Sequence, residues 1–261
     1  MNVVPIFINF LATETLKIDN GRIEAYAQGL KKAGPGRVIS NSGGWQSNNL
    51  DPQAPAMQEL FEAVDAKLNE LHAYFNFDPS RRQVISEAWM NINNRGGFNR
   101  THNHPGSLFS CVYYVNGGEK KGNIMFTTPI EAHAYTIADD YVASRNAFSA
   151  SGITIPPVTG QLLIFPAWLM HYVMPNETDE DRISVALNSR LLLTGSETMK
   201  TSRSRSSTVL TRSGSICATA RSELTKSLIA RCTMSELLFL SFITTVLRWW
   251  ASVLSSRRIR A

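Results

Sequence analysis

Two of the five histidines in this chain stand two residues apart, in the segment NRTHNHPGSLFSCVYYVNGG of residues 99–118. Side chains at positions i and i+2 of an extended segment point to the same face, so His102 and His104 can approach one point together. Imidazole nitrogens bind transition metals at about 2 Å, and this pair could supply two ligands of one ion. A third ligand must come from elsewhere, and the remaining histidines are His72, His133 and His171. The spacing therefore predicts a metal centre.

The elements that must position these residues are two helices followed by many strands. Residues 19–34 begin with a capping Asp or Asn and end at a glycine, and residues 56–75 repeat apolar side chains with the helical period. The sequence then changes to short runs rich in β-branched and aromatic residues, separated by turn-forming residues. These runs lie at 83–93, 108–116, 123–129, 133–138, 152–157, 160–166, 169–175 and 182–193. The order predicts a mainly β protein with flanking helices on one face of a jelly roll.

Four sequence blocks follow one another in a recognisable order. They read EAWMNIN at 87–93, HNHPGSLFSCVYYVN at 102–116, FPAWLMHYVMPN at 165–176 and RISVALN at 182–188, and GGWQSN at 43–48 precedes them. In this order and spacing the blocks resemble the iron(II)- and 2-oxoglutarate-dependent oxygenases, most closely a prolyl-hydroxylase-like branch of bacterial and phage proteins. The resemblance covers most of residues 1–195 and none of the remainder. It implies a double-stranded β-helix, the cupin-like form of the jelly roll.

The resemblance implies the ligands of the metal. His102 matches the first iron ligand and His171 the distal one, whereas His104 falls where most relatives have a carboxylate. Three neutral imidazoles would leave an iron(II) centre with one more positive charge than two imidazoles and a carboxylate. We interpret the site as three histidines. The alternative is that an acid, Asp139 or Asp140, completes the ligand set and one histidine of the pair only supports it.

The resemblance also implies the residues that seat the cosubstrate. Arg182 matches the residue that binds the far carboxylate of 2-oxoglutarate, and a guanidinium presents two parallel donors to a carboxylate. Ser184, two residues further along the same strand, faces the same way and can add a hydroxyl donor. Tyr114 matches a tyrosine that bonds the same carboxylate. The pattern implies no catalytic side chain beyond the metal centre.

The activity implied is hydroxylation of a C–H bond. Iron(II), 2-oxoglutarate as cosubstrate and O2 would be required, with succinate and CO2 as co-products. A protein side chain or a small metabolite is the expected substrate, and the sequence does not identify it. The alternative class is a non-oxygenase, metal-binding, cupin-like jelly roll with an isomerase, structural or interaction role. Arg182 and Tyr114 distinguish the two classes, because a dicarboxylate cosubstrate explains both residues.

Charge and composition divide the chain near residue 195. Residues 196–261 contain 11 Lys or Arg and 3 Asp or Glu, a formal charge of +8, so residues 1–195 carry −3. We expect a catalytic domain over 1–195 that binds no nucleic acid, because a basic surface is the usual signature of such binding. Residues 196–261 are expected to form a basic Ser/Thr/Arg-rich tail, disordered or weakly helical, with a terminal apolar segment.

Cysteine spacing and hydropathy bear on the localisation of the protein and on the role of the tail. Three cysteines without close, even spacing favour a reducing compartment, so we expect a cytoplasmic protein. The apolar run at 237–247 is short for a membrane span. A membrane contact, an amphipathic surface helix and an extension without a selected role stay open for the tail. The sequence does not indicate an oligomeric state.

Overall fold

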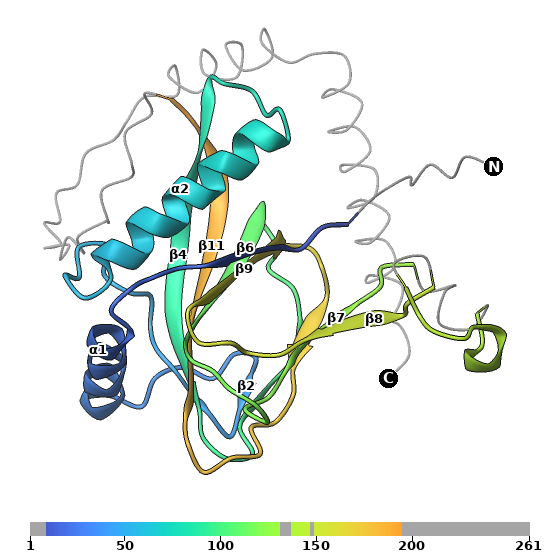
Figure 1. The fold of residues 1–261 in the computed structure, drawn as a ribbon. Coiled ribbons are helices and arrows are strands. Elements are labelled where there is room, and N and C mark those ends of the chain that lie inside the picture. The colour runs from blue at the N-terminus through green and yellow to red at the C-terminus, as the bar shows by residue number, and fades with distance from the viewer. Residues whose placement is uncertain (1–8, 131–136, 147–148, 195–261) are drawn as a thin grey trace, which may run out of the picture. The chain divides into compact units, whose positions relative to one another are not determined.

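The computed structural model describes residues 9–130, 137–146 and 149–194 of the chain. Two helices and eleven strands form in this part, together with a short 3-10 turn (Figure 1). In chain order they are β1 (Ala12–Thr15), α1 (Asn20–Ala33), β2 (Asn41–Ser42), β3 (Trp45–Gln46), α2 (Gln58–Tyr74), β4 (Arg81–Asn93), β5 (Phe98–His102), β6 (Phe109–Asn116), β7 (Ile124–Thr127), η1 (Asp139–Tyr141), β8 (Gly152–Ile155), β9 (Gln161–Pro166), β10 (His171–Val173) and β11 (Arg182–Leu193).

Strands β4 to β11 form one long hairpin that is coiled on itself. β4 pairs with β11, β5 with β10, β6 with β9 and β7 with β8, always antiparallel. Most successive strands change sheet, giving one sheet in the order β1-β9-β6-β11-β4-β3 and a second in the order β2-β5-β10-β7-β8. This arrangement is a double-stranded β-helix, and it confirms the fold class predicted from the sequence.

The main hydrophobic core lies between the helices and the outer face of the six-stranded sheet. In α2, Leu60, Val64 and Leu68 follow the helical period and are fully buried. They belong to one cluster with Met90 and Ile92, alternate residues of β4. Figure 1 shows α2 lying across β4 and β11. The intervening residues of β4 therefore face the other way, into the space between the two sheets.

The strand predictions are confirmed for most runs, but β1, β2, β3 and β5 fall outside the predicted runs, and the omission of β5 is informative. β5 was not among the predicted strands, because its sequence FNRTH is polar and lacks the apolar alternation that marks a strand. It nevertheless ends at His102, so the first predicted metal ligand lies on a strand that the apolar pattern missed. Most of the predicted run at 133–138, including His133, lies outside the described residues, as does the whole predicted tail. No helix of the described part has the length and apolar content to cross a membrane.

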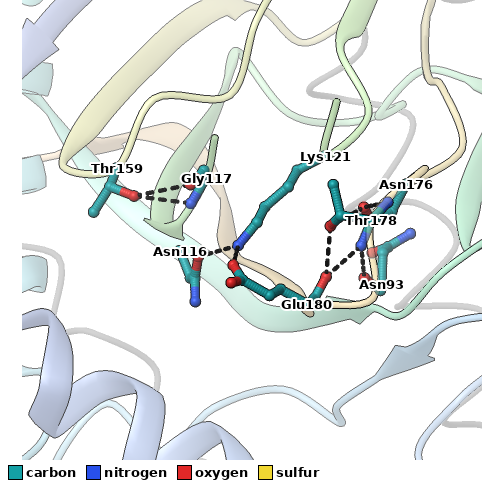
Figure 2. Close-up of polar contacts among 8 residues, drawn as sticks. All are labelled: Asn93, Asn116, Gly117, Lys121, Thr159, Asn176, Thr178 and Glu180. Carbon is teal, nitrogen blue, oxygen red and sulfur yellow. Dashed lines mark hydrogen bonds and ion pairs between the residues drawn. The ribbon is translucent and has the colours of Figure 1, made fainter. Parts of the chain in front are cut away.

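A buried asparagine fixes the loop that leads into β11. Figure 2 shows the Asn176 amide donating to the backbone oxygens of Asn93, at 2.9 Å, and Glu180, at 2.7 Å. Its side-chain oxygen accepts from the backbone N–H and the hydroxyl of Thr178. Beside this group, the buried Lys121 ammonium contacts the Glu180 carboxylate at 2.7 Å. These contacts connect Asn93, the last residue of β4, to Glu180, two residues before β11 begins.

Replacing Asn176 by alanine is expected to lower the free energy of unfolding by about 2–3 kcal/mol, because the buried groups at both ends lose their partners. The measurement is urea unfolding of the full chain, followed by circular dichroism. Asn48→Ala, at an exposed loop position, is the matched control and should change the value by less than about 0.5 kcal/mol. Equal effects of the two substitutions would contradict this role of Asn176.

Candidate metal and cosubstrate site

The space between the sheets holds an inner cavity whose lining follows the two-residue period of the strands. Asn91 and Trp89 project into it from β4, and Arg182, Ser184 and Ala186 from β11. An outer pocket continues the same rows, because its lining includes the next residues, Glu87 on β4 and Asn188 on β11. Four residues line both spaces: Ser40, Trp89, His102 and His104. The two spaces therefore adjoin at the histidine pair.

Three histidines converge at this junction. His102 is the last residue of β5 and His171 the first of β10, and the two are direct partners in the antiparallel pairing of these strands. His104 follows β5 by two residues, and its backbone N–H donates to the Ala167 oxygen at 2.8 Å. One ligand nitrogen from each ring lies within 4.8 Å of the others. Such a cluster could hold one metal ion, and its nitrogen donors fit iron.

Hydrogen bonds set the tautomer of two of the rings. Nδ1 of His102 lies 2.6 Å from the Arg100 backbone oxygen, and Nδ1 of His171 lies 2.9 Å from the Leu169 oxygen. A carbonyl oxygen only accepts, so in each ring Nδ1 carries the hydrogen and Nε2 keeps its lone pair. Both rings are therefore oriented and electronically prepared for metal binding through Nε2.

Burial keeps the three rings unprotonated. Burial, with a smaller contribution from the neighbouring His102, lowers the pKa of His171 to about 3 and that of His104 to about 4. Burial also lowers the pKa of His102, although its bond to the Arg100 oxygen opposes the shift. The pKa values of all three imidazoles thus lie below 7, so protons compete little with a metal ion at neutral pH.

A buried cation lies deeper in the inner cavity. The Arg182 side chain is fully buried, and it donates to the Gly122 backbone oxygen at 3.0 Å and to Asn93 Oδ1 at 3.3 Å. Gly122 has φ of +88°, and an added Cβ would collide with the Met174 oxygen, so only glycine lets this loop reach Arg182. Within the described residues, no acidic side chain comes within ion-pair distance of Arg182, and its Nε has no partner.

Unpartnered polar groups surround this cation. Ser184 pairs with Tyr114 on one neighbouring strand and with Asn91 on the other, so the three side chains form a row across the sheet. The Tyr114 hydroxyl and Asn91 Oδ1 are buried without a hydrogen-bond partner. Burial raises the pKa of Tyr114 to about 12, although the Arg182 charge opposes the shift, so the hydroxyl keeps its proton. A buried guanidinium and a free hydroxyl donor form a site that a carboxylate would satisfy.

The structure brings together all six residues singled out in the sequence. The three histidines, Arg182, Ser184 and Tyr114 line the inner cavity, and their roles stay predictions. His72 is elsewhere, on α2, where its ring packs against Phe77. Asp140 lies on the exposed turn η1, and no acid of the described part joins the histidine cluster.

Sequence reasoning missed the polar residues beside the predicted ones. Asn91 was readable in principle, because it follows Trp89 at the two-residue period of β4. Arg37 was not, since it lies in the loop between α1 and β2, and only the fold brings it to the outer pocket. Gln46 belongs to the quoted block at 43–48, but no role was assigned to it. Arg100 is a polar residue of the unrecognised strand β5.

Comparison with solved structures finds similar chains at low sequence identity. A prolyl-4-hydroxylase from Pseudomonas putida is 19% identical, covers 69% of this chain and 91% of its own, and has a TM-score of 0.46. A Trichoplax adhaerens prolyl hydroxylase in complex with a hypoxia inducible factor peptide fragment is 13% identical, with 69% and 82% covered and a TM-score of 0.49. SnoN, a non-heme alpha ketoglutarate dependent epimerase from nogalamycin biosynthesis, is 12% identical, with 69% and 78% covered and a TM-score of 0.49.

Comparison of the sequence with family models finds a match over part of the chain. No curated protein matches the chain. The family described as "Putative 2OG-Fe(II) oxygenase" matches residues 87–188. This stretch runs from within β4 to within β11 and contains the three clustered histidines, Tyr114, Arg182 and Ser184. The match confirms the resemblance drawn from the sequence motifs over residues 87–188, which are 102 of the 261 residues of the chain.

Proposed function

We propose that this chain is an iron(II)- and 2-oxoglutarate-dependent dioxygenase that hydroxylates its substrate and releases succinate and CO2. One observation carries the proposal. A buried arginine without a counter-charge and three unprotonated imidazoles line the same cavity. A metal alone would explain the imidazoles but not the arginine, whereas a metal with a dicarboxylate cosubstrate explains both.

The histidines would hold the iron. His102, His104 and His171 offer three neutral nitrogens, and the bonds from Nδ1 of His102 and His171 to backbone oxygens keep these two rings from turning. Bound iron(II) supplies the reaction of O2 with 2-oxoglutarate, in which one oxygen atom enters succinate and the other the substrate. The protein contributes the fixed ligand geometry and a site largely closed to water.

Arg182, Tyr114 and Ser184 would seat the far carboxylate of 2-oxoglutarate. The Arg182 guanidinium is held at one side by Gly122 and Asn93, so its orientation does not depend on the ligand. The Tyr114 hydroxyl is buried, protonated and free to donate. Charge-assisted bonds gain strength where water is excluded, so this end of the cavity would bind and orient the cosubstrate.

A non-oxygenase metal protein is the second candidate. Histidine at position 104, in place of the carboxylate of most relatives, gives three imidazoles, and such a set also suits zinc. On this reading the metal would still bind, but 2-oxoglutarate would not. The first experiment below tests the metal ligands, and the second, on 2-oxoglutarate, separates the two functions.

Metal binding is expected to depend on His104 and not on Asp140. His104→Ala in the full chain should weaken iron(II) or zinc binding by at least about tenfold, because one of three ligands is lost. His104→Asp should keep the metal, since a carboxylate can occupy the same position. The measurement is metal content after gel filtration under argon.

Asp139→Ala and Asp140→Ala are the controls for this experiment. Both should retain the metal as the unchanged chain does. Loss of metal in either aspartate variant, with retention in His104→Ala, would contradict the three-histidine site and support an acidic third ligand.

Arg182→Ala is expected to raise the KM for 2-oxoglutarate on the order of 100-fold, because two charge-assisted bonds are lost. The measurement is succinate formation by the iron-loaded full chain in air, without an added substrate. Arg190→Ala is the matched control, since Arg190 lies on the same strand with an exposed side chain. Bound iron without 2-oxoglutarate binding in the unchanged chain would favour the second candidate.

A further inference from the structure

The outer pocket is placed to receive the substrate. It adjoins the inner cavity at His102 and His104, whose side chains are partly exposed, whereas His171 is buried with 3% of its surface accessible. A molecule in this pocket would therefore lie beside the exposed side of the histidine cluster. The chemical class of such a molecule can be inferred from the charged residues that line the pocket.

Two arginines in this lining have no acidic partner. Arg37 donates from Nε to the Ser47 backbone oxygen at 3.1 Å and from Nη2 to Asn49 Oδ1 at 3.3 Å. Arg100 donates from Nη2 to the Ile39 backbone oxygen at 2.8 Å. These acceptors are neutral, and across the described residues neither guanidinium comes within ion-pair distance of a carboxylate. A guanidinium has five N–H donors, so both arginines keep donors for a ligand.

Backbone contacts bring the two arginines to one short segment. The Arg100 backbone N–H donates to the Ser40 oxygen at 2.9 Å, and its side chain reaches the oxygen of the residue before. Arg37 begins this segment and is held by a backbone bond of 2.7 Å to the Gln46 oxygen. The two guanidinium groups are thus oriented by the loop between α1 and β2, which is fixed against β3 and β5.

Gln46 adds an unsatisfied polar group to the same pocket. Its side chain lines the pocket, only 3% of its surface is accessible, and its Oε1 has no hydrogen-bond partner. A buried amide oxygen without a partner costs free energy that a bound ligand could recover. One acid, Glu87, also lines the pocket, and it accepts a bond of 3.3 Å from the Asn188 amide. Two arginines and one glutamate leave an excess of one positive charge.

We propose that the outer pocket binds a small carboxylic acid as the substrate of the oxygenase, an inference that rests on the function proposed above. Arg37 and Arg100 hold its carboxylate, and Gln46 bonds a neighbouring polar group. A carboxylate carries the single negative charge that the pocket lacks, whereas a phosphate monoester would bring up to two. The acid would then lie beside the metal with its C–H bonds on the side of His102 and His104.

Ligand-observed saturation-transfer NMR can test this assignment on the full chain, loaded with zinc and saturated with 2-oxoglutarate to fill the inner cavity. The probes are three mixtures: small monocarboxylic hydroxy acids, the primary amides of the same acids, and sugar phosphates. We expect signals from at least one acid and none from its amide or from the phosphates. The double variant Arg37→Gln/Arg100→Gln should weaken that binding at least about tenfold, since charge-assisted bonds are lost.

The matched control is Arg82→Gln/Arg190→Gln, which removes two exposed arginines outside the pocket and should leave the signals unchanged. The assignment would be overturned if acids and amides bound equally, if only phosphates bound, or if no acid gave a signal. It would also be overturned if acid binding survived the Arg37/Arg100 double substitution. The 2-oxoglutarate signals serve as a separate readout, and Arg182→Ala should abolish them. Their absence in the unchanged chain would overturn the proposed function, whatever the mixtures show.

Discussion

The antiparallel pairing of β4 with β11 determines what faces the space between the sheets. Arg182 pairs with Asn93, Ser184 with Asn91 and Ala186 with Trp89. Because side chains alternate between the faces of a sheet, a slip of one residue would turn Arg182 and Ser184 toward the helices. It would also bring Ile183 into the cavity, where an apolar side chain cannot replace the guanidinium. The apolar residues packed under α2 oppose such a slip, so the hydrophobic core also sets the register of the polar site.

The electrostatic character of the inner cavity follows from this register. Burial disfavours charge, and here it leaves the three imidazoles neutral while Arg182 stays charged, because a guanidinium does not lose its proton at physiological pH. A buried cation beside an unpartnered hydroxyl is costly unless an anion completes it. The same burial that makes the histidines good ligands therefore makes the arginine a strong determinant of what else can bind.

From the sequence, the histidines and Arg182 of the inner cavity could be located, but not the polar residues around them. The histidines could be found because only five occur in the chain, and Arg182 because its position after His171 matches a family pattern. β5 was not predicted because FNRTH lacks apolar alternation. This strand is stabilised by pairing with β10 and β2 and not by a high intrinsic β propensity. The outer pocket combines Arg37, Gln46 and Arg100, which come from three separate segments of the chain. A local sequence pattern does not indicate which distant segments lie together in the folded protein.

His104 lines both the inner cavity and the outer pocket, and its lack of charge affects both. When the inner site is filled as proposed, iron(II), Arg182 and the 2-oxoglutarate dianion together carry one positive charge, because three imidazoles add none. A carboxylate at position 104 would cancel that charge. The neutral ligand set would therefore leave a positive centre beside a pocket that itself has an excess positive charge from Arg37 and Arg100. Both charges would attract a carboxylate. The departure from the family pattern and the arginines of the pocket thus favour the same kind of substrate.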